Sequence, residues 1–130
     1  MENNKSAVDI TESEWYVLDV LWDHSPRTAK ELTDVLKNSI GWSRSTTLTM
    51  LRRMTDKGLL ICEKESTGPQ TYSTMLSRDE VRLRETEHFL KRVYRGSISM
   101  MLSAMTDGNK LNDSEIAELY EVLRQAEQKK

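Results

Sequence analysis

The clearest pattern in the chain is a two-faced stretch over residues 43–57. At 3.6 residues per turn, one side carries residues suited to a core: Thr47, Met50, Leu51 and Met54. The opposite side carries hydroxyl and charged residues: Ser45, Thr49, Arg52 and Asp56. Lys57-Gly58-Leu59 follows, and a glycine just past the last turn is typical of a helix end. The pattern predicts a helix from about Ser43 to Lys57 that packs on a core and presents a polar face.

Four other helix starts share one signal, the capping box, in which a Ser, Thr or Asn precedes a Glu by three positions. The pairs are Thr11 with Glu14, Thr28 with Glu31, Ser77 with Glu80, and Asn112 with Glu115. They predict helices over about residues 12–22, 29–37, 78–95 and 113–128, with a methionine-rich helix over 97–105 between the last two. We expect the first helix to bury Trp15, Leu18, Leu21 and Trp22.

Two short extended runs follow the two-faced stretch. Residues 60–64 and 71–74 flank a turn with Gly68-Pro69, which is a signal for a hairpin loop. Three short helices and a β-hairpin form a winged helix-turn-helix, in which the third helix reads DNA. We therefore predict a mainly α fold with a small β-hairpin: a winged-helix DNA-binding domain over residues 1–77 and a three-helix dimerisation domain over residues 78–130.

The three C-terminal helices carry narrow apolar stripes that cannot bury much surface within one chain. Pairing with a second copy would give these stripes a shared core, so we expect a homodimer. Methionines at helical spacing are more often gap-filling core than ligands of a soft metal. The candidate interface residues are Phe89, Val93, Ile98, Met101, Leu102, Met105, Ile116, Leu119, Tyr120 and Leu123.

Charge and composition narrow the function. A net charge of −2 argues against a protein coated in positive charge, yet residues 43–57 contain four basic residues and one acidic residue. One cysteine, Cys62, allows neither an internal disulfide nor a cysteine-based metal site, and His24 and His88 have no ligands near them in the sequence. The chain lacks a phosphate loop and a nucleophile motif, so we expect no enzyme activity, cofactor or metal.

The polar face of the helix over residues 43–57 supplies candidate DNA contacts. A hydroxyl donates or accepts at base edges, which makes Ser45, Thr46 and Thr49 the candidates for base contact. The candidates for contact with the DNA backbone are Ser43, Arg44, Arg52, Arg53 and Lys57. Two alternatives remain: an ordinary solvated face, and a winged helix that docks a protein. The second would usually show aromatic anchors.

Several motifs taken together resemble one family. They are Thr11 to Trp15, Trp42-Ser43, Thr46-Thr47, Leu51 to Met54 with Lys57-Gly58, and Phe89 to Gly96. From Ile10 to about Arg124 the chain resembles the penicillinase-repressor (BlaI/MecI) family of winged-helix transcriptional repressors, related to the copper-responsive CopY branch. The resemblance implies a cytoplasmic homodimer that sits on an inverted-repeat DNA operator, with its third helix in the major groove, and blocks transcription.

The resemblance also implies that an inducing signal relieves repression, such as proteolytic cleavage in the C-terminal lobe by a sensor or protease. The family's cut lies at an Asn-Phe bond, and our alignment places Ala104-Met105 there, which is a departure from the pattern. The cysteine cluster of the copper branch is also missing. No apolar run approaches the length of a membrane span, and the first residues lack the apolar core of a signal peptide, so we expect a cytoplasmic protein without membrane insertion.

Overall fold

The computed structural model describes residues 10–130. The chain forms two compact units, one up to Glu85 and one from Thr86 on, and the boundary falls within helix α4. In chain order, the first unit contains α1 (Glu12–Asp23), β1 (Arg27–Thr28), α2 (Ala29–Ile40), α3 (Arg44–Asp56), β2 (Ile61–Lys64), β3 (Gln70–Ser73) and the start of α4 (Arg78–Tyr94). The second unit contains the rest of α4, then α5 (Ile98–Asp107) and α6 (Asp113–Gln128).

The helices begin where the capping boxes predicted. At α1, the Thr11 hydroxyl accepts the Glu14 N–H at 3.1 Å, and the Glu14 carboxylate accepts the Thr11 N–H at 3.0 Å. The same reciprocal pairs close the starts of α2 and α6. At α2, the hydrogen bond from the backbone N–H of Thr28 lowers the pKa of Glu31, because it stabilises the ionised carboxylate. Local sequence thus sets these boundaries without help from distant residues.

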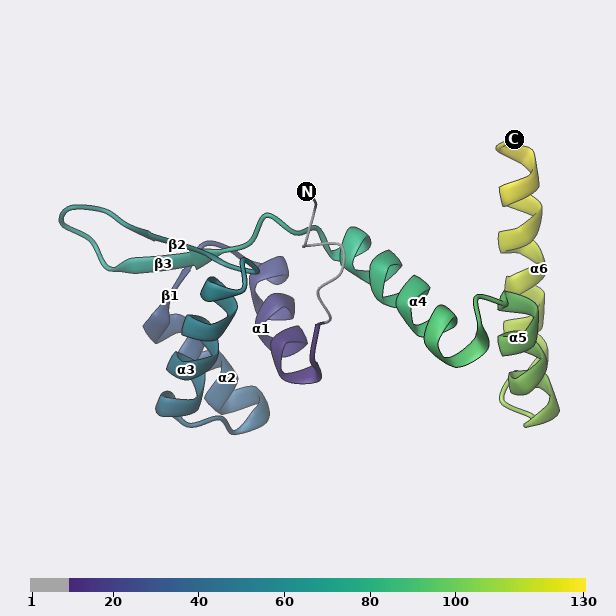
Figure 1. Cartoon of the computed structure of the whole chain (residues 1–130), viewed down its shortest axis with the longest axis horizontal. Helices are drawn as coiled ribbons and strands as arrows, with labels where there is room; N and C mark the ends of the chain where they lie inside the picture. Colours follow the sequence, from purple (N-terminus) through teal and green to yellow (C-terminus); the bar gives the residue numbers. More distant parts are fainter. Residues whose placement is uncertain (1–9) are drawn as a thin grey trace. The chain divides into compact units, whose positions relative to one another are not determined.

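The core of the first unit lies among α1, α2 and α3, which cluster together in Figure 1. Its buried residues are Val17, Leu18, Leu21, Leu32, Leu36, Leu51, Met54, Leu59 and Leu60. A leucine buried in this way contributes roughly 1.5–3 kcal/mol relative to an exposed one. Trp15 and Trp22, which were predicted to be buried, are only half-buried; their rings pack edge to face, and Trp22 packs against the core.

The wing is a three-stranded antiparallel sheet in the order β1-β3-β2. The hairpin of β2 and β3 was predicted, and its loop projects beyond the helices in Figure 1. Strand β1 was not predicted; its two residues pair with Thr71 and Tyr72 of β3. Gly58 has a φ of +83°, which lets the chain turn sharply out of α3 toward the hairpin.

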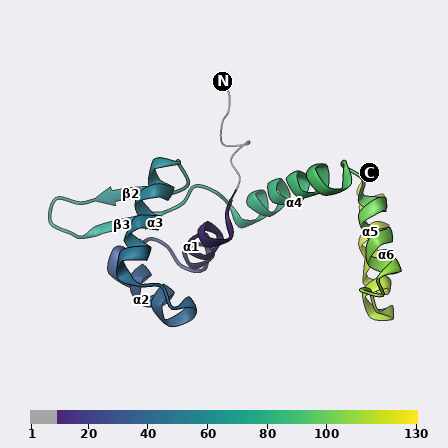
Figure 2. The same ribbon diagram turned by 60° about the horizontal axis from the view of Figure 1, so that its bottom comes forward.

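In the second unit, α5 and α6 lie side by side (Figures 1 and 2). Neither helix contains a buried side chain, although both carry apolar stripes. Ile98, Tyr120 and Leu123 are 58%, 65% and 59% exposed, which leaves much of this apolar surface uncovered within one chain. In the part of the chain that the structure describes, no helix has the length and apolar character needed to span a membrane.

Candidate nucleic-acid interface

Helix α3 places its two faces as the sequence predicted. Thr47, Leu51 and Met54 are buried against the other helices of the first unit. The candidate base-contact residues Ser45 and Thr49 are both exposed and lie one turn apart on the same side. Thr46 is also exposed. The structure therefore brings all three hydroxyls to the solvent side of one helix, although their contact with DNA stays a prediction.

The first turn of α3 is organised by Ser43. Its hydroxyl oxygen accepts the backbone N–H of Thr46 at 3.1 Å and donates its own proton to the Thr46 hydroxyl at 3.0 Å. The Thr46 hydroxyl can still donate a hydrogen bond to a further partner. The two hydroxyls thus form a short chain of hydrogen bonds at the start of the helix. This turn contains no acidic residue, and the partial positive charge of the helix N-terminus is therefore open to a phosphate.

The four basic candidates of α3 fall into two groups. Arg44, Arg52 and Arg53 are exposed, and no ion pair within residues 10–130 engages them. Lys57 differs because its ammonium nitrogen lies 2.6 Å from a carboxylate oxygen of Glu14. The three arginines are thus available to an external anion, whereas a DNA phosphate would have to compete with Glu14 for Lys57.

A hollow of about 350 Å³ lies between the starts of α2 and α3. Arg44 and Leu48 line it from α3, and Lys30 lines it from α2. Leu48 is half-buried and packs against the core. Lys30 was not predicted at this place, because only the packing of α2 against α3 brings it to the hollow. Lys30 already pairs with Asp34, which lines the same hollow, at 3.2 Å, so it is not a free basic group beside α3.

Tyr72 of the wing lies near enough to Arg52 of α3 for the charge of Arg52 to affect the pKa of Tyr72. Tyr72 of β3 is paired across the hairpin with Cys62 of β2. Burial raises the pKa of Tyr72, and the neighbouring Cys62 acts in the same direction, while the positive charge of Arg52 opposes both. The phenol of Tyr72 therefore stays neutral near pH 7.

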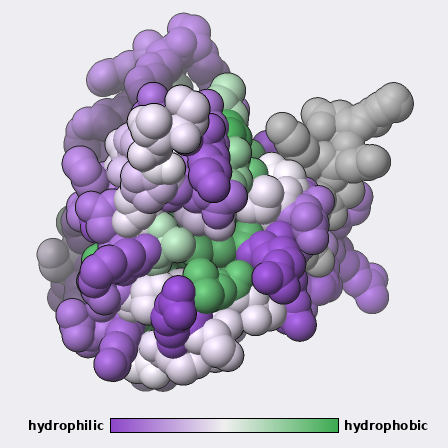
Figure 3. All heavy atoms as spheres, turned by 90° about the vertical axis from the view of Figure 1, so that its left-hand side faces the viewer, coloured by the Kyte–Doolittle hydropathy of each residue, from purple (hydrophilic) through white to green (hydrophobic). Residues whose placement is uncertain are grey.

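The face that carries the hairpin is mostly hydrophilic, with a small apolar hollow at its centre (Figure 3).

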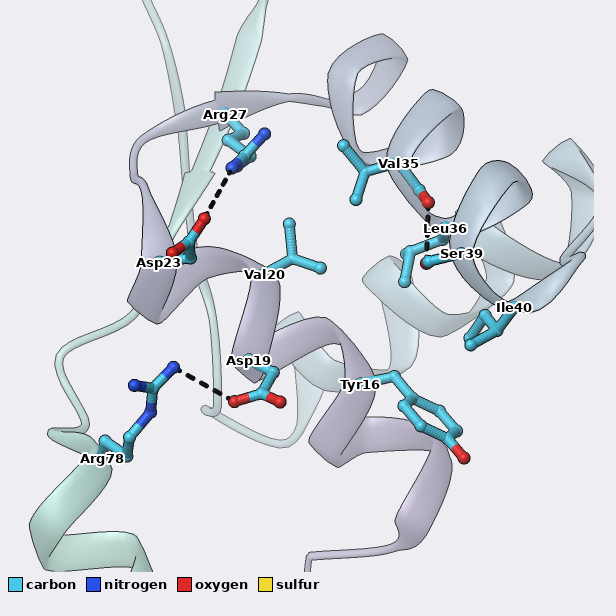
Figure 4. A pocket seen from close by; sticks show the side chains of 10 residues that line it. All are labelled: Tyr16, Asp19, Val20, Asp23, Arg27, Val35, Leu36, Ser39, Ile40 and Arg78. Carbon is cyan, nitrogen blue, oxygen red and sulfur yellow. Dashed lines mark hydrogen bonds and ion pairs between the residues drawn. The ribbon is translucent and has the colours of Figure 1, made fainter.

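A second cavity, of about 390 Å³, opens between α1 and α2 (Figure 4). Its charged groups already pair with each other: Asp23 with Arg27 at 3.8 Å, and Asp19 with Arg78 at 3.2 Å. None of the predicted site residues lines this cavity. Across residues 10–130, no group of three or more His, Cys, Asp and Glu side chains is placed to hold a metal ion.

Three packed helices, a β-hairpin wing and an exposed hydroxyl-and-arginine face on the third helix define a winged helix of the DNA-binding class. The chain belongs to the penicillinase repressor family, whose family model matches residues 10–125. This family is made up of DNA-binding transcriptional repressors, not enzymes. The predicted fold class and family are therefore confirmed.

Individual relatives are similar along nearly their whole length. The penicillinase repressor of Bacillus licheniformis is 29% identical over 97% of this chain and 98% of its own. The methicillin resistance regulatory protein MecI of Staphylococcus aureus (strain N315) is 23% identical over 92% of this chain and 97% of its own. A similar solved structure is the solution structure of the Bacillus licheniformis BlaI monomeric form in complex with the blaP half-operator, with 30% sequence identity and a TM-score of 0.50. The match covers 56% of this chain and 88% of that chain.

Proposed function

We propose that this chain represses transcription by binding an inverted-repeat DNA operator as a homodimer, with α3 of each copy in the major groove. The observation that carries the proposal is the exposed face of α3, where three hydroxyls lie beside three arginines that have no ion pair within residues 10–130. Hydroxyls at Ser45, Thr46 and Thr49 suit base edges, and the arginines with Ser43 suit phosphates. The similar BlaI structure is a complex of a monomeric form with a half-operator.

The exposed apolar residues of α4 to α6 support the dimer. Six of the ten candidate interface residues are at least a third exposed in the single chain: Phe89, Val93, Ile98, Ile116, Tyr120 and Leu123. The other four are half-buried: Met101, Leu102, Met105 and Leu119. Of these, Leu102 and Leu119 line two shallow apolar grooves between α5 and α6. A second copy would remove this surface from water, and dimers are typical of the family.

Repression needs a release step, and the C-terminal unit is where we place it. A cut within α5 would divide a helix that carries four of the ten candidate interface residues. Loss of the dimer would then leave two weakly held half-site contacts, because the second binding event would no longer be intramolecular. The sensor or protease that makes the cut is a further partner in this proposal. A repressor has to reach the DNA that it binds, so the proposal places it in the cytoplasm.

Selection from a pool of random-sequence duplexes tests this function. The pool is incubated with the full chain at low salt, and bound duplexes are recovered and sequenced. We expect enrichment of two copies of one short sequence in inverted orientation. The same selection with a triple variant, Ser45→Ala, Thr46→Ala and Thr49→Ala, should enrich a different sequence or none. A wild-type pool that stays random would show that the chain does not bind DNA specifically, and would favour a protein-docking winged helix instead.

A further inference from the structure

One arginine fastens the start of α4 to α1. The Arg78 guanidinium donates to the Asp19 carboxylate at 3.2 Å, and its central carbon lies 5.5 Å from the centre of the Trp22 ring. Figure 4 shows Arg78 at the first turn of α4, pointing toward Asp19 on α1. A single side chain thus makes an ion pair and a cation–π contact with residues one turn apart on the same helix.

Neighbouring contacts hold the same segment in place. The indole N–H of Trp22 donates to the backbone carbonyl of Leu76 at 2.8 Å, just before α4 begins. Val81, in the first turn of α4, is 1% exposed. The backbone N–H of Ile10 donates to the Glu85 carboxylate at 3.4 Å. Residues 76–85 are therefore attached to the winged-helix unit at several points, in agreement with the unit boundary after Glu85.

The contacts of Arg78 matter for the position of this side chain more than for stability. The side chains of Arg78 and Asp19 are 40% and 52% exposed, and an ion pair this exposed stabilises a protein only slightly. The Nε of Arg78 is nevertheless buried and has no hydrogen-bond partner among residues 10–130, which is unfavourable for a charged donor. An arginine that served only to keep the surface soluble would leave this donor in water. The burial of Nε therefore indicates that the role of Arg78 is to lie between Asp19 and Trp22.

We infer that Asp19, Trp22 and Arg78 form a clamp that fastens the first turns of α4 to the winged-helix unit, and that this attachment limits the half-site spacings that the dimer accepts. The inference rests on the proposed function. Helix α4 continues from Arg78 to Tyr94 and carries Phe89 and Val93, two candidate interface residues. Each reading helix is thus connected to the dimer lobe through the segment that the clamp holds. Arg78 is a positioning residue here and touches no DNA.

Binding to operators of altered spacing tests the clamp. The probes are inverted repeats of the half-site that the wild-type chain selects, with the central spacer changed by one or two base pairs, and a duplex with one half-site. Each added base pair rotates the second half-site by roughly 35° about the DNA axis. The variants are Asp19→Asn, Arg78→Ala and the double variant. The control is Lys91→Ala, which removes a charge from an exposed position further along α4.

We expect the wild-type chain and Lys91→Ala to lose affinity steeply when the spacer changes, and the three clamp variants to lose roughly three- to tenfold less. The double variant should match the single variants, because both remove one interaction. Affinity for the single half-site should stay within about twofold in all variants, as expected for residues that do not contact DNA.

Two results would overturn the clamp. One is a spacing profile of Asp19→Asn that is identical to that of the wild type, because this conservative change preserves the fold. The other is a loss of affinity for the single half-site in Arg78→Ala, which would make Arg78 a DNA contact. A wild-type chain that selects single half-sites and no inverted repeat would contradict the proposed dimeric operator instead, and the half-site duplex separates that failure from a failure of the clamp.

Discussion

Lys57, at the end of α3, donates to the carboxylate of Glu14 at the start of α1, with 2.6 Å between nitrogen and oxygen. The Glu14 side chain is 6% exposed and the Lys57 side chain 37%. The other carboxylate oxygen of Glu14 accepts the backbone N–H of Thr11 in the capping box. One buried carboxylate therefore ties the first helix of the unit to the end of the reading helix. The pair therefore helps to hold the end of α3 against α1.

Lys57→Ala should lower the free energy of unfolding by roughly 1–3 kcal/mol, because it leaves a buried carboxylate without its cation. Urea denaturation followed by circular dichroism measures the change. The matched control is Arg53→Ala, which removes a positive charge from an exposed position one turn earlier and should change stability by no more than about 0.5 kcal/mol. Equal effects of the two substitutions would mean that the pair with Glu14 adds nothing to stability.

Thr49→Ala should change which operator sequence the chain prefers, with the fold almost unchanged, because Thr49 is exposed and its hydroxyl and methyl suit base edges. Competition between variant duplexes in a fluorescence anisotropy assay measures the preference. Thr47→Val is the matched control two positions away, where the side chain is buried and its hydroxyl has no hydrogen-bond partner in the part of the chain that the structure describes. That control should keep the wild-type preference. If Thr49→Ala keeps it too, Thr49 does not read bases.

Arg52→Ala should weaken binding to all duplexes alike and reduce the slope of log affinity against log salt by about one unit, as expected for the loss of one phosphate contact. Titrations over a range of salt concentrations measure the slope. Lys91→Ala, an exposed change of the same charge on α4, should leave the slope unaltered. A loss confined to one operator sequence would instead assign Arg52 to base recognition.

Leu123→Asp should convert the dimer to a monomer in sedimentation velocity experiments. Leu123 is 59% exposed in the single chain, so an aspartate there does little to the folded protomer but places a charge in the predicted interface. Gln125→Asp adds the same charge on the opposite side of α6 and should leave the dimer intact. A dimer that survives Leu123→Asp at micromolar concentration would show that the interface lies elsewhere.

Local signals in the sequence predicted most of the fold, whereas contacts between distant residues could not be predicted. Capping boxes involve residues three positions apart, so Thr11, Thr28 and Asn112 marked helix starts that the structure confirms. The apolar stripe of α3 likewise identified Leu51 and Met54 as core. Strand β1 has two residues and no pattern of its own, because it exists only through pairing with β3.

The candidate site shows the same limit. Periodicity placed Ser45 and Thr49 on the polar side of α3, since only the spacing within one helix decides this. The same spacing grouped Lys57 with the free arginines, although Lys57 pairs with Glu14, 43 positions earlier. Lys30 and Arg44 approach the same hollow only after α2 and α3 pack together. Neither relationship has a signal in the local sequence.

Dimethyl sulfate footprinting tests most directly whether α3 reads DNA from the major groove as a pair. The reagent methylates guanine N7 in the major groove and adenine N3 in the minor groove, so the two grooves are scored separately. On the inverted repeat selected by the wild-type chain, we expect protection of guanine N7 in two symmetric patches whose centres lie about one helical turn, or a multiple of it, apart. Protection of adenine N3 alone, or of one patch only, would contradict two copies of α3 in successive major grooves.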